Sequence, residues 1–403
     1  MDWTLLRRPK SRTAFAAAVI GGLLAASACS SNSGGSSGAA SGGASGANSG
    51  TVKVVGIEPL TGPAAFAGID AQKGYDLAIQ EINDQGYLGG GKKISVSWED
   101  TQGSIPTAAS ETASVIADQS VSAAFGSVSS QEAVAQSPLA QKAGLPIVYT
   151  QAGSAGVVVG NYTYRATPLM STYYPDIKKY LQENHWKSVG IIYTNISETL
   201  QEIGSTTLPQ IASELGMKVT KSVVTTESTQ DFSAAIQQVL ASKPDVVSIL
   251  EIGAANPTAM TELRQAGYTG PVLGNSGASA GNLKPAGKNG VGMVWPVDFD
   301  ASQTAASSQK FVSDYKAKYG VAPANYAAEA YDAAWFLARS IKDAGSADRT
   351  KIKAGMAQAA AGTTNGALGE NLTWTHGTIN TPGVVVEWDG TGTKLLYSSS
   401  TGS

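Results

Sequence analysis

From Thr51 onward, short apolar runs alternate with longer segments in which apolar residues recur every three or four positions. The first run, TVKVVGI, precedes AQKGYDLAIQEIN, where Tyr75, Ala78 and Ile82 have helical spacing. The alternation continues through KKISVSWED, IPTAASETASVIADQ, VSAAFG, SQEAVAQSPLAQKAG and LPIVYT. It predicts βαβ units that build a mainly parallel sheet.

A second block repeats the alternation. It runs through STYYPDIKKYLQENH, SVGIIYT, ETLQEIGSTTLPQIASELG, MKVTKSVV, DFSAAIQQVLASK, DVVSILE, NPTAMTELRQAG and GPVLGN. Two such blocks predict two doubly wound halves. The roughly 350 residues that follow Thr51 also exceed the size at which a single core keeps growing, so we expect two lobes.

The last part of the chain changes character. Three helix-like segments follow GVGMVWPVDFD without strand-like runs between them: TAASSQKFVSDYKAKYG, ANYAAEAYDAAWFLARSIKDAG and RTKIKAGMAQAAAG. We expect these helices to return and cover the first sheet, so that the chain crosses between the lobes more than once. The tail NLTWTHGTINTPGVVVEWDGTGTKLLY predicts antiparallel strands with a turn at Asp389 and Gly390.

The N-terminus has the layout of a secretory signal. Basic residues between Arg7 and Arg12 precede the apolar run TAFAAAVIGGLLAASA, which ends just before Cys29. We expect residues 1–28 to be removed. AASAC resembles the bacterial lipobox, in which the cysteine becomes the lipidated first residue, and the Ser-, Gly- and Ala-rich stretch within residues 29–50 is typical of a flexible tether. The resemblance implies an exported lipoprotein anchored in the cell membrane; an uncleaved anchor and a free thiol at Cys29 are the alternatives.

Charge and cysteine content exclude several classes of function. The chain carries 28 basic and 31 acidic residues and no long basic run, so we expect no nucleic acid partner. Cys29 is the only cysteine, which excludes an intramolecular disulfide. No Cys/His or carboxylate cluster has metal-ligand spacing, so we expect neither a metal nor a cofactor.

Two short motifs are typical of enzymes, but both are weak evidence for an enzyme. Gly86–Lys93, GYLGGGKK, partly fits a phosphate-binding loop, yet it follows a helix and opens a strand, which is the reverse of the required order. GASAG around Ser279 matches a nucleophile elbow, with Asp298 and His376 later in a suitable order. Such matches arise easily in a chain with 46 glycines. We expect a Gly-rich turn and a solvated loop, no catalytic residue, and a serine hydrolase only as a remote alternative.

Loops at the carboxyl ends of the predicted parallel strands are the better candidates for a site. These loops are EPLTGPAAFAG, GSVSSQEA and YTQAGS. Open α/β sheets bind ligands at this edge, and the helix starts there favour an anion. Ser129 and Ser130 can cap the helix that begins near Gln131 or meet a ligand oxygen.

Three further residues are candidates for ligand contact. Phe66 is an aromatic residue in a polar loop. Tyr149 ends a buried strand and points either toward the crevice or into the core. Glu251 ends the strand-like run VVSIL, where it meets the crevice or forms a salt bridge.

Taken together, these segments resemble the type I periplasmic binding proteins, in particular the branched-chain amino acid binders of ABC importers. The resemblance covers nearly the whole body, through PLTGPAAFAG, GGGKKISVSWEDTQ, AAFGSVSSQEAVAQSPLAQKAGLPIVYTQAGS, YTYRATP, SVGIIY, DFSAAIQQVLASKPDVV, LRQAGYTGPVLG, YAAEAYDAAWFLARSI and WDGTG. It implies an α/β fold of two doubly wound lobes with mainly parallel sheets, joined by three crossovers near Thr167, Val297 and Leu372. The lobes would comprise residues 51–167 with 298–371, and residues 168–297 with 372–403.

The resemblance also implies a site. Ser130 would bind the carboxylate of an amino acid, Ala152 would contribute backbone groups, and Ser154 stands one place beyond the expected hydroxyl residue. The acid that binds the ammonium group would fall near Ser276 and is missing here. Either Glu251 supplies the counter-charge or the ligand lacks an amine.

We therefore expect a monomeric receptor that captures a small organic ligand between two closing lobes and delivers it to ABC permease subunits. A branched-chain or other hydrophobic amino acid is the first expectation for the ligand. Amides, urea-like compounds and aromatic acids are alternative ligands, and a ligand sensor for a signalling partner is an alternative role.

Overall fold

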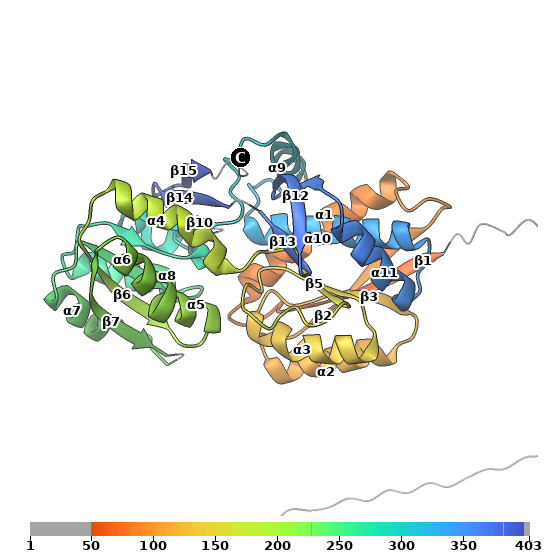
Figure 1. Cartoon of the computed structure of the whole chain (residues 1–403), viewed down its shortest axis with the longest axis horizontal. Coiled ribbons are helices and arrows are strands. Elements are labelled where there is room, and N and C mark those ends of the chain that lie inside the picture. The colour runs from red at the N-terminus through yellow and green to blue at the C-terminus, as the bar shows by residue number, and fades with distance from the viewer. Residues whose placement is uncertain (1–49, 227, 280, 382, 399–403) are drawn as a thin grey trace, which may run out of the picture. The chain divides into compact units, whose positions relative to one another are not determined.

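The computed structural model describes residues 50–226, 228–279, 281–381 and 383–398. The predicted signal segment, Cys29 and all but the last residue of the predicted tether lie outside the described residues. The described chain forms two sheets with helices around them (Figure 1). Each sheet has a hydrophobic cluster of buried residues on both faces. This arrangement confirms the predicted α/β class.

The first sheet has eight strands in the order β11-β12-β13-β5-β4-β3-β1-β2. Strands β1 to β5 pair in parallel, while β12 pairs antiparallel with both β11 and β13. The bounds are β1 Thr51–Glu58, β2 Lys93–Asp100, β3 Val121–Phe125, β4 Ile147–Tyr149, β5 Thr163–Arg165, β11 Thr364–Gly366, β12 Gly369–Thr375 and β13 Thr378–Asn380.

Helices distant in sequence cover this sheet together. In Figure 1, α1 and α10 lie side by side with α11 next to α10, whereas α2 and α3 lie on the opposite face. The bounds are α1 Ala65–Asp84, α2 Ile105–Ala117, α3 Ser130–Ala143, α9 Ala306–Tyr319, α10 Asn325–Ala344 and α11 Arg349–Ala360. The helices after the second block thus return to the first sheet, as predicted. We call this sheet with its helices the first lobe.

The contact between α1 and α10 depends on a glycine. A Cβ atom at Gly74 would lie 2.1 Å from the carbonyl oxygen of Ala327. Only a residue without a side chain allows the two helix backbones to approach this closely.

The second sheet has seven strands in the order β15-β14-β10-β9-β8-β6-β7. Strands β6 to β10 pair in parallel, and β14 pairs antiparallel with β10 and β15. The bounds are β6 Ser188–Thr194, β7 Lys218–Thr225, β8 Val246–Leu250, β9 Val272–Leu273, β10 Met293–Val297, β14 Val384–Trp388 and β15 Thr393–Ser398. Asp389 Oδ1 accepts hydrogen bonds from the backbone N–H groups of Thr391 and Gly392, which confirms the predicted turn.

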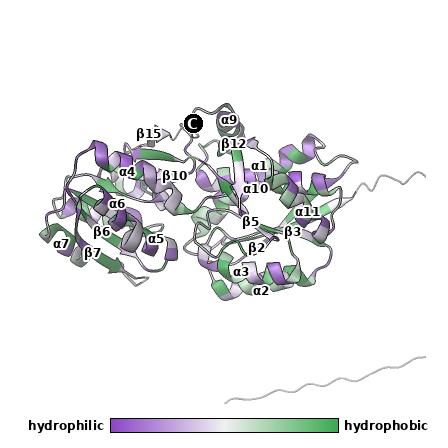
Figure 2. Ribbon diagram, in the orientation of Figure 1, coloured by the Kyte–Doolittle hydropathy of each residue, from purple (hydrophilic) through white to green (hydrophobic). Residues whose placement is uncertain are grey.

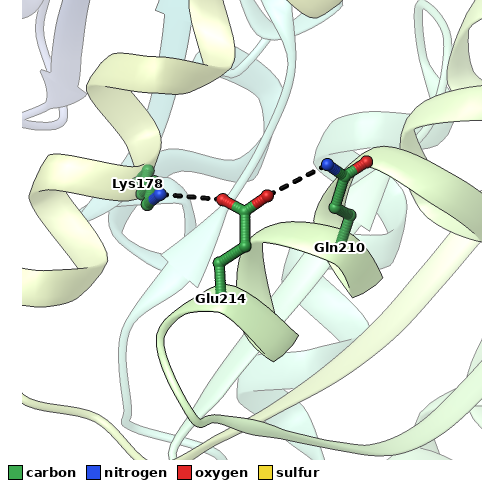
Figure 3. Close-up of polar contacts among 3 residues, drawn as sticks. All are labelled: Lys178, Gln210 and Glu214. Atoms are coloured by element: carbon green, nitrogen blue, oxygen red, sulfur yellow. Dashed lines mark hydrogen bonds and ion pairs between the residues drawn. The ribbon is translucent and has the colours of Figure 1, made fainter.

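Helical segments flank the second sheet, and together they form the second lobe. The bounds are η1 Met170–Tyr173, α4 Tyr174–Glu183, α5 Glu198–Glu202, η2 Ile203–Thr207, α6 Leu208–Glu214, α7 Ser233–Ala241, α8 Ala255–Gln265, η3 Ser276–Ala278 and η4 Lys284–Gly290. An ion pair joins α4 to α6: Lys178 Nζ lies 2.7 Å from Glu214 Oε2, and Gln210 Nε2 donates to Glu214 Oε1 (Figure 3). Both charged side chains are about 40% exposed, so the pair adds little to stability.

The expected boundary at Leu372 is wrong. Strand β12 pairs with β13, and β13 pairs with β5 through Thr378 and Arg165, so both strands belong to the first sheet. Leu372 and Trp374 are buried in the core that α1 and α10 share. The chain therefore passes to the second lobe for the last time between β13 and β14.

Hydropathy follows this arrangement. Figure 2 shows hydrophobic colour along strands such as β14 and a mixture of hydrophobic and hydrophilic colour along α2 and α3. All five residues of β3, β8 and β10 are buried, as expected for strands that are covered on both faces.

Candidate ligand-binding cleft

A cavity of about 540 Å³ is lined by loops at the carboxyl ends of strands in both lobes. The first lobe contributes Pro63, Ala64, Phe66, Ala67, Gly103, Val128, Ser129, Ser130, Gln131, Glu132, Gln151 and Tyr326. The second lobe and the connection to it contribute Met170, Asn195, Ile196, Ser197, Thr199, Leu200, Ile252, Asn275, Ser276 and Gly277. Of the eight predicted site residues, Phe66, Ser129, Ser130 and Ser276 line this cavity.

Side chains also hydrogen-bond directly from lobe to lobe. Gln131 Nε2 donates to the carbonyl oxygen of Ile196 at 2.6 Å. The hydroxyl groups of Ser154 and Thr199 form a second bond between the lobes. The described conformation is therefore one in which the two lobes meet around the cavity.

The start of α3 supplies hydrogen-bond donors to the cavity. The helix begins at Ser130, one residue earlier than predicted, and the hydroxyl of the N-cap residue Ser129 makes no capping bond. Ser130 Oγ accepts from the backbone N–H of Ser154 at 3.2 Å, which leaves its own hydrogen available. Because the first N–H groups of a helix lack intrahelical acceptors, this corner favours an anionic group such as a carboxylate.

Two aromatic rings form an apolar wall. Phe66, at the start of α1, and Tyr326, at the start of α10, meet edge to face with ring centroids 5.7 Å apart. Apolar side chains around them include Val128, Met170, Leu200 and Ile252. This wall suits an aliphatic or aromatic ligand body.

Gln151 is a cavity residue that the sequence analysis missed. It follows β4 with a φ of 51°, and its side-chain Nε2 donates to Ser276 Oγ of the second lobe at 3.3 Å. The position of YTQAGS at a strand end was a usable signal, because any polar residue there can face the crevice.

Tyr149 and Ala152 are not among the residues that line the cavity, and the expectation that they contact a ligand stays a prediction. Both are fully buried in the core between α2, α3 and the first sheet. The hydroxyl of Tyr149 forms a 2.9 Å hydrogen bond with Ser137 Oγ, and the carbonyl oxygen of Ala152 accepts from Arg165 Nη1 at 2.8 Å. The strand alternation turned Tyr149 inward, one of the two orientations that the sequence left open.

Ser154 and Glu251 lie behind the cavity wall. Ser154 is buried, and its hydroxyl is used in the bond with Thr199. Glu251 is 3% exposed, and its Oε1 accepts from Thr225 Oγ1 at 2.5 Å. Burial raises the pKa of Glu251 to about 7. The next residue, Ile252, lines the cavity instead.

The hydrolase alternative receives no support from the contacts of Ser279. Its Oγ accepts a 3.0 Å hydrogen bond from Trp295 Nε1, and an indole N–H cannot act as a base. Asp298 accepts from Thr167 Oγ1 at 3.1 Å, and His376 lies in the turn between β12 and β13 of the other lobe. The Gly-rich stretch Gly86–Lys93 forms the turn between α1 and β2, as predicted.

Two further features are absent from the part of the chain that the structure describes. No group of three or more His, Cys, Asp or Glu side chains there could hold a metal ion. Among the same residues, no helix has both the length and the hydropathy that crossing a membrane requires.

Two doubly wound lobes that meet around a solute-sized cavity define a solute-binding class of protein. Residues 51–393 match the family described as periplasmic binding protein, and the chain belongs to this family. The resemblance inferred from the sequence is thereby confirmed. The family is one of extracytoplasmic substrate-binding proteins, which are not enzymes.

Relatives and solved structures agree with this assignment. The Leu/Ile/Val-binding protein homolog 7 of Brucella melitensis is 25% identical over 298 residues, which cover 68% of this chain and 72% of that protein. The leucine-binding protein LivK from Thermotoga maritima superposes with a TM-score of 0.79 at 26% identity, over 86% of this chain and 98% of that one. A solute-binding protein from R. palustris, in complex with benzoate, shares the fold with a TM-score of 0.77 at 21% identity, over 86% of this chain and 96% of that one.

Proposed function

We propose that this protein is the solute receptor of an ABC importer and that it binds a small organic acid with an apolar body. The observation that carries this proposal is the pairing, in one cavity, of the uncapped start of α3 with the Phe66–Tyr326 wall. The helix start suits a carboxylate, and the aromatic wall suits a hydrocarbon body.

Amino acids and amine-free acids are the competing ligand classes. A related solved protein, LivJ from Streptococcus pneumoniae, was obtained in complex with isoleucine, and two from R. palustris in complex with benzoate and 4-hydroxybenzoate. Among the described residues that line the cavity, Glu132 is the one acid, and its side-chain oxygens are buried away from solvent. Burial raises the pKa of Glu132, which weakens it as a partner for an ammonium group. We therefore favour an amine-free acid over the branched-chain amino acid that the resemblance first suggests.

Binding would act by stabilising the conformation in which the lobes meet. A ligand can touch both Ser129 of the first lobe and Ser276 of the second only in that conformation. A ligand shifts a conformational equilibrium by its difference in affinity for the two states. Micromolar affinity, which suits a scavenging receptor, requires about 8 kcal/mol.

We also propose that residues 1–28 are removed, that Cys29 carries a lipid and that residues 29–50 tether the receptor to the membrane near its permease. The proposal rests on the order of basic residues, apolar run and AASAC in the sequence. Expression with radiolabelled palmitate tests it: the chain should incorporate label, and Cys29→Ser should not. Unlabelled wild-type protein in the membrane fraction would contradict lipidation while leaving the binding function untouched.

Thermal unfolding with a panel of candidate ligands tests the binding function. The panel contains leucine, isoleucine, benzoate, 4-hydroxybenzoate, amides and urea derivatives. A ligand at about 100 times its dissociation constant should add about 2.7 kcal/mol to the free energy of unfolding. The variant Ser129→Ala tests the carboxylate contact. It should reduce the stabilisation by carboxylates, and the stabilisation by uncharged compounds, which should not change, is the control. Stabilisation by amides alone would contradict the carboxylate site.

A further inference from the structure

The side chain of Gln151 is held at its oxygen end by α10. Asn325 Nδ2 donates to Gln151 Oε1 at 2.7 Å and to Glu329 Oε1 at 3.1 Å. The backbone N–H of Gln151 also donates to Glu329 Oε2. These bonds fix both the main chain and the amide of Gln151.

This arrangement determines which end of the amide reaches the cleft. In the structure the oxygen of Gln151 faces the NH₂ group of Asn325, and the NH₂ group of Gln151 faces Ser276. One amide hydrogen bonds to Ser276 Oγ, and a second remains. Ser276 likewise keeps its own hydroxyl hydrogen, and neither hydrogen meets an acceptor among the described residues.

We propose that Gln151 and Ser276 form a donor pair that selects a ligand with a hydrogen-bond acceptor close to its carboxylate, such as a 2-oxo acid, over the corresponding 2-amino acid. The inference rests on the proposed function and names its ligand class. Gln151 follows β4, and β4 is paired with β3, whose loop leads to α3, so a small ligand at the α3 start can reach both groups.

An ammonium group fits this pair poorly. Ammonium offers only donors, and it would face the N–H of Gln151 and the O–H of Ser276. The remaining lone pair of Ser276 is a neutral acceptor and does not balance the charge. Leaving buried polar groups without partners is how binding sites reject an analogue that differs by one group.

Asn325 and Glu329 are positioning residues in this scheme. Neither needs to touch the ligand, because both act by orienting Gln151. Replacement of Asn325 by Leu should free the amide of Gln151 and reduce the discrimination between ligand classes.

Three ligands of nearly equal shape test the inference: leucine, 4-methyl-2-oxopentanoate and 4-methylpentanoate. They share a carboxylate and an isobutyl group. At carbon 2, leucine carries a hydrogen-bond donor, 4-methyl-2-oxopentanoate an acceptor and 4-methylpentanoate neither. Isothermal titration calorimetry of the whole protein should show the oxo acid binding at least tenfold more tightly than either of the others. The series phenylalanine, phenylpyruvate and 3-phenylpropanoate should give the same order if the cavity prefers an aromatic body.

Variants separate the donor pair from the carboxylate site. Gln151→Met keeps the size of the side chain and should reduce the preference for the oxo acid over the plain acid to less than threefold. Ser276→Ala should reduce it in the same direction. Ser129→Ala is the control: it should weaken oxo and plain acids by the same factor and so preserve their ratio.

The outcomes distinguish failure of the inference from failure of the proposed function. Tightest binding of leucine or phenylalanine to the wild-type protein would overturn the donor pair and leave the receptor function standing. An unchanged preference in folded Gln151→Met would also overturn it. If no carboxylate binds at all, the proposed function fails first. If a variant does not fold, the order of the ligand affinities of the wild-type protein decides whether the inference holds.

Discussion

The buried carboxyl of Glu251 gives a quantitative prediction about stability. Its pKa is raised by burial to about 7 from an ordinary 4.5, with the hydroxyl of Thr225 as a partly compensating donor. Between these two pH values the folded protein binds more protons than the unfolded chain, so stability falls as the pH rises. The full difference corresponds to about 3 kcal/mol.

Glu251→Gln removes the titration while keeping the shape of the side chain and an acceptor for Thr225. At pH 5 the variant should be within about 1 kcal/mol of the wild type. From pH 5 to pH 8 the free energy of unfolding of the variant should rise by about 2.5 kcal/mol relative to that of the wild type, because only the wild type must ionise a buried group.

Urea unfolding followed by tryptophan fluorescence at the two pH values measures this gain. Glu202→Gln, an exposed glutamate in the same lobe, controls for the loss of one negative charge. A difference between the variant and the wild type that stays constant within about 0.5 kcal/mol from pH 5 to pH 8 would refute the reasoning, because it would mean that Glu251 titrates alike in the folded and unfolded chains.

Three further predictions follow from the packing. Gly74→Ala should lower the free energy of unfolding by about 3 kcal/mol, since the new methyl group collides with the backbone of α10. Gly362 has open space around it, so Gly362→Ala should leave the free energy of unfolding nearly unchanged in the same urea titration. Phe66→Ala should weaken binding of the best ligand at least about tenfold in calorimetry by removing half of the aromatic wall; equal affinity would place the ligand elsewhere. Burial raises the pKa of Asp298, and the pKa of the buried Glu329 carboxyl nearby is raised as well, so the free energy of unfolding of Asp298→Asn should fall less than that of the wild type between pH 5 and pH 8; a steeper fall would contradict the raised pKa of Asp298.

The alternation of apolar runs was enough to predict the α/β class, the two sheets and the return of α9 to α11. It could not assign β12 and β13 to a sheet, because strand-like patterning does not say which of two sheets a strand will join, and the boundary at Leu372 that the family resemblance implied was wrong. That choice depends on the burial of Leu372 and Trp374 against α10. We expected one helix over residues 198–216. The structure instead has a π-helical turn there, Ile203–Thr207, just before Pro209. Proline lacks a backbone N–H donor and so interrupts a regular helix.

The site was predictable by location and much less by residue. Strand ends gave Phe66, Ser129 and Ser130, because position along the chain is sufficient to place them at the crevice. The inward turn of Tyr149 and the inward burial of Glu251 depend on neighbours from other elements, such as Ser137 and Thr225. Gln151 acquires its role only from its partners on α10 and in the second lobe, which no local pattern contains.

The route of the chain between the sheets has a consequence for how the protein is made. The core of the first lobe needs α10, Asn325–Ala344, to cover α1, and its sheet ends with β13 at Asn380. The second sheet needs β14 and β15, the last strands of the described chain. During synthesis from the N-terminus, neither lobe can complete its core until nearly the whole sequence has left the ribosome. The unfinished chain therefore stays open until β13 has been made for the first lobe and β15 for the second.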